Sequence, residues 1–189
     1  MKTRKIIRQI LLIMLLLCSC TGLLRVQAAT AKADALQAYR NYLENQRSFL
    51  KFSVIYLDKD AIPELVLNDG KIFTYKKSTG MKLLQDDYEF DYKKYYKKKG
   101  VICSDIIMGA MMGYDVVVYS RVVSGKLKGF CRSHHYTSGK WEYAKYSRSR
   151  ISKVSKAQFN ALIRKYAGKK KLTKIKYHAN TAADRDRYL

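Results

Sequence analysis

Residues 52–67 read FSVIYLDKDAIPELVL, and they mark the point at which the sequence changes from a helical to a strand pattern. Two apolar runs flank a short acidic turn, and Pro63 favours extended backbone at the residue before it. We therefore predict two short strands joined by a turn that carries Asp58, Asp60 and Glu64. The chain on either side can be interpreted from this change of period.

Upstream, residues 31–47 place Leu36, Tyr39 and Leu43 at helical spacings, which predicts an amphipathic helix that ends near Ser48. Downstream, turn signals that contain glycine recur between short runs rich in valine, isoleucine, tyrosine and phenylalanine. These runs predict strands at residues 52–57, 63–67, 71–76, 81–85, 100–107, 114–123, 126–137 and 140–147. A second amphipathic helix follows, because Ser155 and Gln158 fit a capping box and Gly168 fits a C-cap.

A last strand is predicted at residues 172–179, and the polar tail at 179–189 is expected to fray. The predicted fold class is α+β, an antiparallel meander sheet of short strands flanked by an N-terminal and a C-terminal amphipathic helix. No stretch rich in Pro, Gly and Ser divides residues 30–189, so we expect them to form a single domain.

Residues 1–29 predict a signal peptide, because MKTRKIIR is basic and the apolar run after it is short. Two cleavage sites fit. Residues 26–28 read VQA, a small-residue site that would release a secreted protein, whereas residues 17–20 read LCSC, a lipobox that would leave a lipid on Cys20. We expect secretion, with lipid anchoring at the cell surface as the alternative. In both cases the protein is extracytoplasmic and meets membrane only through the signal peptide or the lipid.

Charge is the most extreme property of the sequence. The net charge is +23, and residues 1–29 hold five basic residues and no acidic one, which leaves +18 for residues 30–189. Such a surface favours anionic partners, and outside a bacterium these are cell-wall polymers, glycans or surface proteins. Nucleic acid is expected to bind only non-specifically.

We therefore expect an exported, non-catalytic binding module. The alternative is a small extracytoplasmic hydrolase that uses dispersed carboxylates or a Cys/His pair.

The most basic segment interleaves lysine with tyrosine and is the candidate patch for an anionic ligand. It comprises Lys93, Lys94, Tyr95, Tyr96, Lys97, Lys98 and Lys99. The same pattern in a strand can mean that tyrosine faces the core while lysine faces water. Trp141, the only tryptophan, is expected to pack in the core.

Two cysteines, Cys103 and Cys131, fall in predicted strands and can form a disulfide if those strands are neighbours. Otherwise they are buried small apolar residues. A thiol enzyme would need Cys131 as nucleophile and His134 or His135 as base, which is a less favoured reading. Successive strand residues face opposite sides of a sheet, so these two histidines are not expected to share a metal ion. The sequence contains no Walker loop, nucleophile elbow or zinc-protease helix motif.

The acidic turn permits a calcium ion, because calcium takes six to eight oxygen ligands from alternating acidic positions and a late Glu. We favour a structural turn in which Asp58 and Asp60 accept hydrogen bonds from backbone N–H groups, with calcium as the alternative. The stretch resembles the D-x-[DN]-x-D-G-x-P-E-L turn of small exported proteins of Gram-positive gut bacteria. Tyr56 and Ala61 stand where that pattern has its first Asp and its Gly. The resemblance implies an exported protein with an N-terminal helix followed by hairpins.

Overall fold

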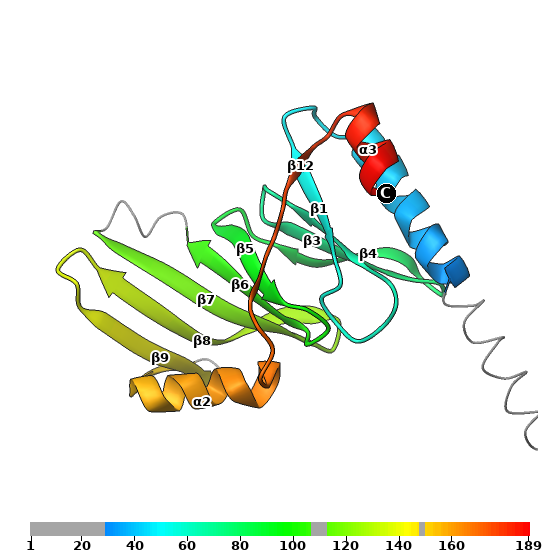
Figure 1. Ribbon diagram of the computed structural model, residues 1–189. Helices are drawn as coiled ribbons and strands as arrows, with labels where there is room; N and C mark the ends of the chain where they lie inside the picture. Colours follow the sequence, from blue (N-terminus) through cyan, green and yellow to red (C-terminus); the bar gives the residue numbers. More distant parts are fainter. Residues whose placement is uncertain (1–28, 107–112, 148–149) are drawn as a thin grey trace, which may run out of the picture.

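The computed structural model describes residues 29–106, 113–147 and 150–189, which form two antiparallel sheets and three helices (Figure 1). The α+β class is confirmed. Two sheets are present where a single meander was predicted, and most of the consecutive strands within each sheet remain neighbours. The predicted signal peptide up to residue 28, including Cys20, lies outside the described residues.

The five-stranded sheet has the order β12-β1-β2-β3-β4, and all the pairs given for it are antiparallel. Its strands are β1 (Lys51–Ile55), β2 (Glu64–Leu67), β3 (Lys71–Lys76), β4 (Gly80–Asp86) and β12 (His178–Ala179). Every residue of β2 is buried. Leu65 and Leu67 pack with the N-terminal helix, and Val66, on the opposite face, packs towards the second sheet. This double burial explains the unbroken apolar run in the sequence.

The seven-stranded sheet has the order β10-β9-β8-β7-β6-β5-β11. Its strands are β5 (Phe90–Tyr96), β6 (Val101–Ile106), β7 (Tyr114–Val123), β8 (Lys126–Tyr136), β9 (Trp141–Ser147), β10 (Arg150–Val154) and β11 (Thr173–Lys174). Two of these strands, β5 and β10, were not predicted. The residues of β10 lie directly before the predicted capping box.

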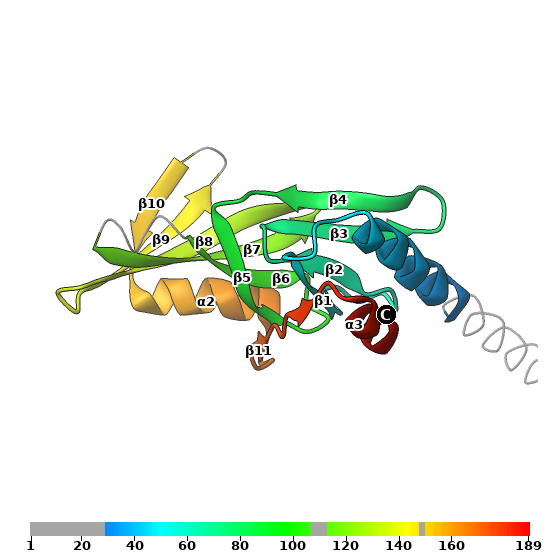
Figure 2. The same ribbon diagram turned by 90° about the horizontal axis from the view of Figure 1, so that it is seen from above.

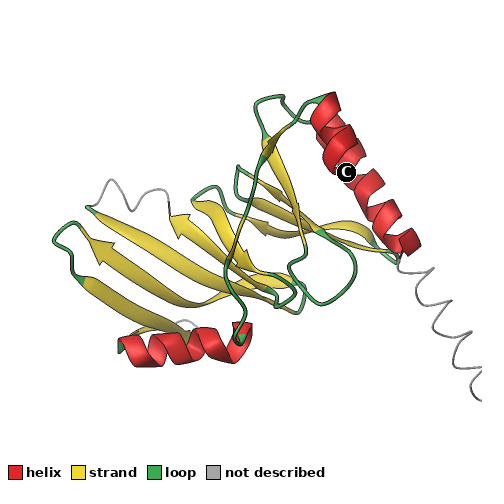
Figure 3. Cartoon of the chain, viewed as in Figure 1, coloured by secondary structure: helices red, strands yellow, loops and turns green. Residues whose placement is uncertain are grey.

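The helix at residues 29–44 lies on the outer face of the five-stranded sheet, where Ala35, Tyr39 and Leu43 are fully buried. The predicted stripe is confirmed. The C-terminal helix α3 (Ala182–Tyr188) lies beside it (Figure 3), and Arg40 forms an ion pair with Asp186. The tail that was expected to fray forms a helix at residues 182–188, and this ion pair joins it to the first helix.

Helix α2 (Lys156–Ala167) covers one face of the seven-stranded sheet (Figure 2). The predicted capping box is confirmed, since Ser155 Oγ accepts from Gln158 N and Gln158 Oε1 accepts from Ser155 N. Gly168 is the C-cap, also as predicted. Phe159 is the buried anchor of this helix and packs with Val101, Phe130 and Cys131.

The two sheets share a core. Ile55, Val66 and Ile72 of the five-stranded sheet pack in one cluster with Tyr92 and Ile102 of the seven-stranded sheet. The single strand predicted at residues 172–179 is divided between the sheets, because β11 pairs with β5 and β12 pairs with β1. This segment crosses from α2 to the five-stranded sheet (Figure 1), and we call residues 169–179 the strap.

Candidate functional site

The turn between β1 and β2 is closed by its own carboxylates. Asp58 Oδ1 accepts a hydrogen bond from Asp60 N at 3.0 Å, and Asp60 Oδ1 accepts one from Ile62 N at 2.9 Å. The predicted capping of the turn by Asp58 and Asp60 is therefore confirmed. The N-terminal helix secures the turn from above, because the buried hydroxyl of Tyr39 donates to the Pro63 carbonyl at 2.8 Å.

Glu64 is the unusual member of this turn, because its side chain is buried and only 1% of the residue surface is exposed. Its Oε2 accepts from Leu57 N at 2.8 Å, whereas the buried Oε1 has no hydrogen-bond partner among the described residues. One oxygen from each of Asp58, Asp60 and Glu64 lies within 4.8 Å of the other two.

Burial and crowding change the proton affinity of these carboxyls. Burial raises the pKa of Glu64 to about 8, and the charges of Asp58 and Asp60 act in the same direction. Burial and the neighbouring Asp58 raise the pKa of Asp60 to about 6. The turn thus holds three oxygens in a small volume and disfavours their full ionisation.

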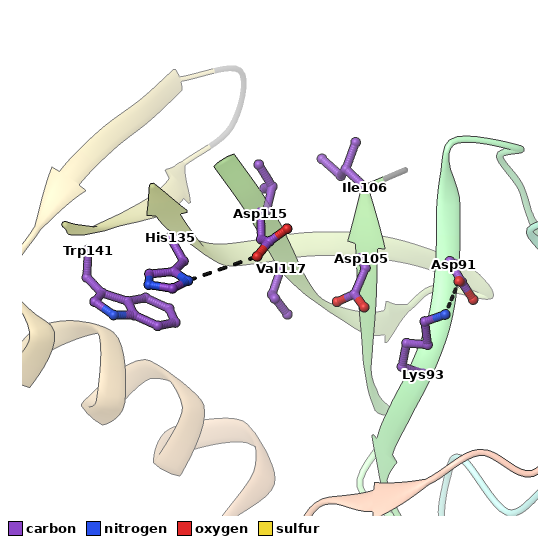
Figure 4. A pocket seen from close by; sticks show the side chains of 9 residues that line it. Asp91, Lys93, Asp105, Ile106, Asp115, Val117, His135 and Trp141 are labelled. Atoms are coloured by element: carbon purple, nitrogen blue, oxygen red, sulfur yellow. Dashed lines mark hydrogen bonds and ion pairs between the residues drawn. The ribbon is translucent and has the colours of Figure 1, made fainter. Parts of the chain in front are cut away.

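A second candidate site lies on the face of the seven-stranded sheet that α2 covers only in part. Trp141 is 51% exposed there, so the prediction that it packs in the core is wrong. Its ring stacks on His135 with centroids 4.3 Å apart and an interplanar angle of 18° (Figure 4). Tyr143 lies nearly parallel to it at 6.3 Å. The register explains this row, because His135 on β8 pairs directly with Trp141 on β9.

A hollow of about 510 Å³ opens beside these rings, and we call it the Trp141 hollow. Its polar lining comes from strands β5 to β8 and consists of Asp91, Lys93, Asp105, Asp115 and His135. Asp91 pairs across the strands with Asp105, and Asp115 with His135, which brings acids from distant parts of the sequence to one face (Figure 4).

The charges in the Trp141 hollow are partly compensated. Lys93 forms an ion pair with Asp91, and His135 Nδ1 lies 4.0 Å from Asp115 Oδ2. Burial raises the pKa of the Asp105 carboxyl; nearby Lys93 opposes this shift, whereas Asp91 adds to it. The surroundings of Asp105 therefore disfavour its charged form.

Two smaller hollows adjoin the first and share lining residues with it. One, of about 340 Å³, shares Lys93, Asp105 and Val117 and reaches Lys174 of the strap. The other, of about 350 Å³, shares Asp115 and His135 and reaches the β8–β9 turn. Together with the Trp141 hollow they form one recessed surface that crosses the strands.

The tyrosines of the basic segment 93–99 face inward, as the strand interpretation of this pattern predicts, so the segment does not form the single patch of lysine and tyrosine that was the other candidate. Tyr95 is buried in the core between the sheets, and Tyr96 packs in the cluster under α2. Lys93 faces the Trp141 hollow, whereas Lys97 lies over the ring of Tyr56 at 5.8 Å. The two tyrosines therefore pack in or against the core, and only the lysines are available to a ligand.

The candidate disulfide is not formed, and both cysteines are buried free thiols. Tyr119 on β7 pairs with Cys103 on one side and with Cys131 on the other. Two strand spacings separate their backbones by roughly 10 Å, beyond the reach of a disulfide of about 7 Å. Burial also raises the pKa of Cys131 to about 12, so it carries no thiolate at neutral pH.

The histidines do not assemble into a catalytic pair or a metal site. His135 lies four residues along β8 from Cys131, roughly 13 Å away. His134 faces the opposite side of the sheet, and His178 lies in the other sheet, stacked on Tyr188. Within the described ranges, the only cluster of three or more potential metal ligands is that of Asp58, Asp60 and Glu64.

Sequence reasoning missed the Trp141 hollow. Asp91, Asp105 and Asp115 are 24 residues apart at most, but only the pairing of β5, β6 and β7 places them on one face. The one available signal was the alternation of the strands, which places every second residue on the same face. It did not extend to Asp91, because β5 was not predicted as a strand.

No family model matches the sequence, and no curated protein matches it. Among solved structures, the chain is similar to a Xanthomonas protein described as Type IV secretion system related, with a TM-score of 0.42 and 11% identity. The match covers 59% of this chain and 60% of that chain, so it spans less than two thirds of the other protein. A likeness of this degree carries no argument about function. No helix in the described part of the chain is long and apolar enough to cross a membrane.

Proposed function

We propose that this chain is an exported, non-catalytic module that binds a cell-wall glycan in the Trp141 hollow. The observation that carries the proposal is the exposed ring of Trp141, held in place by its stack on His135. A large aromatic ring that remains half-exposed beside a hollow offers a flat apolar surface to a ligand.

The chemistry of the hollow fits a sugar. Sugar rings have apolar C–H faces that can stack on an aromatic ring, while their hydroxyl groups point outward at the edges. Asp105 and Asp115 line the same hollow and can accept hydrogen bonds from such hydroxyls. The adjoining hollows add binding surface on both sides, which suits a chain of sugars rather than a single one.

The acids of the hollow argue against an anionic group at this position. Three carboxylates face it, and one lysine offsets part of their charge. The large positive charge of the rest of the surface has a different role in this proposal. It draws the protein towards anionic wall polymers over a long range and in a salt-dependent way.

Retention on purified cell walls tests the proposal. The protein is applied to walls with and without their anionic polymers, at low and at high salt. Glycan binding predicts retention on stripped walls that persists at high salt, where screening weakens charge-driven binding.

Trp141→Ala should weaken retention on stripped walls at least about tenfold. Tyr88→Ala is the matched control, because Tyr88 is also an exposed aromatic residue but lies outside the hollow. Loss of all retention after stripping would contradict glycan binding and leave the polyanion as the ligand.

Asp105 supports one alternative, a hydrolase that uses dispersed carboxylates. Its pKa is raised by burial, as a general acid requires, and Asp91 lies directly across from it. Incubation with wall glycan would then release new reducing ends, and Asp105→Asn would abolish the release. Absence of reducing ends with the unchanged protein would remove this alternative.

A further inference from the structure

We propose that the turn between β1 and β2 binds a calcium ion through carboxylate oxygens of Asp58, Asp60 and Glu64. This site is separate from the Trp141 hollow and does not depend on the proposed function. It reverses the preference drawn from the sequence, which favoured a purely structural turn.

The buried oxygen of Glu64 is the first reason. A buried polar atom without a partner costs free energy, and almost all such atoms in folded proteins are paired. Glu64 Oε1 is buried and accepts no hydrogen bond from any described residue, although Oε2 of the same carboxylate accepts one from Leu57 N. Glu64 supplies one of the three clustered oxygens, so a cation at the cluster would bind this same carboxylate.

The closeness of the three carboxylates is the second reason. Their oxygens lie within 4.8 Å of one another, and no lysine or arginine forms an ion pair with any of them among the described residues. Like charges at this separation repel, and this repulsion adds to burial in raising the pKa values of Glu64 and Asp60. A divalent cation converts this repulsion into attraction.

Calcium fits this donor set because it is a hard cation that prefers oxygen ligands and tolerates irregular geometry. Three carboxylates do not complete six to eight ligands, so water and backbone carbonyls must supply the others. We therefore expect weak binding, in the range of extracellular calcium modules, with a Kd of about 0.1–1 mM.

The departures of this turn from the calcium-loop pattern do not block the site. Ala61 replaces a glycine, yet among the described residues only Lys98 and Ser124 combine a side chain with a positive φ. The backbone at Ala61 therefore does not need glycine. Tyr56 replaces an acid and lowers the number of ligands, and its ring lies beneath the ammonium groups of Lys32 and Lys97.

Thermal unfolding with chelator, with Ca²⁺ and with Mg²⁺ tests the proposal on the purified protein. At 10 mM Ca²⁺, a Kd of about 0.1–1 mM raises the folding equilibrium constant by roughly 10- to 100-fold, and the melting temperature rises with it. Mg²⁺ should have a much smaller effect, because it requires near-ideal octahedral geometry and keeps its water.

Three variants test whether the response to Ca²⁺ arises from this cluster. Glu64→Gln and Asp58→Asn should each remove the response to Ca²⁺, and Asn at 58 can still accept the hydrogen bond from Asp60 N. Asp87→Asn is the matched control, because Asp87 accepts a similar hydrogen bond, from Glu89 N, but lies outside the cluster. The absence of a saturable response in the unchanged protein, an equal response to Mg²⁺, or a full response in both cluster variants would overturn the proposal.

Discussion

At the scale of single residues, Glu64 and Trp141 occupy surroundings opposite to those that their chemistry favours. A carboxylate is buried in one case, and a large aromatic ring is exposed in the other. Glutamate is seldom fully buried without a partner, and an exposed tryptophan beside a hollow is a common feature of binding surfaces. These two departures mark the two sites proposed for this protein.

Glu64 should make stability depend on pH when calcium is removed. Its pKa is about 8 in the folded protein and about 4.5 when unfolded, so between these values the folded state binds more protons. Stability should therefore fall as pH rises through this interval, by up to about 1.4 kcal/mol per pH unit. Urea unfolding in chelator at pH 5, 6, 7 and 8 measures the slope.

Glu64→Gln should flatten this slope, because glutamine resembles the protonated acid and does not titrate. The other titratable groups that face Glu64 are Asp58, Asp60, Tyr39 and Tyr95. Asp60 contributes in the same direction, but only up to its pKa of about 6. An unchanged slope above pH 6 in Glu64→Gln would show that Glu64 does not titrate as described.

The sequence predicted the residues of the acidic turn and the hydrogen bonds of Asp58 and Asp60. It could not predict the buried oxygen of Glu64, because burial on that face is produced by the second sheet. The prediction that Trp141 is buried was wrong for a related reason. The general preference of tryptophan for the interior was used without knowing where α2 ends on the sheet.

At the scale of elements, local signals were the most reliable. The capping box at Ser155 and the C-cap at Gly168 were predicted correctly, because both depend on neighbours within a few residues. The strand β10 was missed because its residues carry few apolar side chains and lie next to a strong helix signal. The strand β5 was missed because a register shift between Tyr92 and Lys94 disturbs its alternation.

Removal of the cap of α2 should cost measurable stability. Ser155→Ala leaves Gln158 N without its acceptor, and we expect a loss of about 1 kcal/mol. Ser152→Ala, in the exposed strand β10, is the control and should change stability by less than about 0.5 kcal/mol. Chemical denaturation of both variants gives the comparison, and equal effects would contradict the role of the cap.

The C-terminal helix should also be stabilising rather than frayed. Arg185 donates to the side chain and the carbonyl of Asn180, and Leu189 packs against the cluster beneath the N-terminal helix. Deletion of residues 182–189 should therefore lower the melting temperature by several degrees, as expected for a loss of about 1–2 kcal/mol. A melting temperature identical to that of the full chain would show that α3 adds nothing to the fold.

At the scale of the whole molecule, the division of the strands into two sheets could not be predicted from the sequence. A strand has the same period of two in either sheet, so periodicity cannot assign β4 and β5 to different sheets. The division of residues 172–179 between β11 and β12 depends on contacts with strands about 80 and 125 residues earlier. Such contacts are tertiary, and they leave no local signal in the sequence of the strap.

The same long-range pairing creates the Trp141 hollow, so the proposed function belongs to this scale. Strands β5 to β9 each contribute one to three residues to it, and α2 covers only the neighbouring part of the face. A binding surface built in this way depends on the register of the whole sheet. The three carboxylates of the acidic turn, in contrast, lie within seven consecutive residues.

The most direct test of the account is the fluorescence of Trp141, because it is the only tryptophan in the chain. The protein is titrated with soluble oligomers of N-acetylglucosamine, while emission and quenching by acrylamide are recorded. Glycan binding in the Trp141 hollow predicts a saturable change in emission and protection from acrylamide, with affinity lowered about tenfold or more in Asp105→Asn. If the protein is retained on stripped walls while the emission and quenching of Trp141 stay unchanged throughout the titration, the glycan does not bind in this hollow and the central claim is wrong.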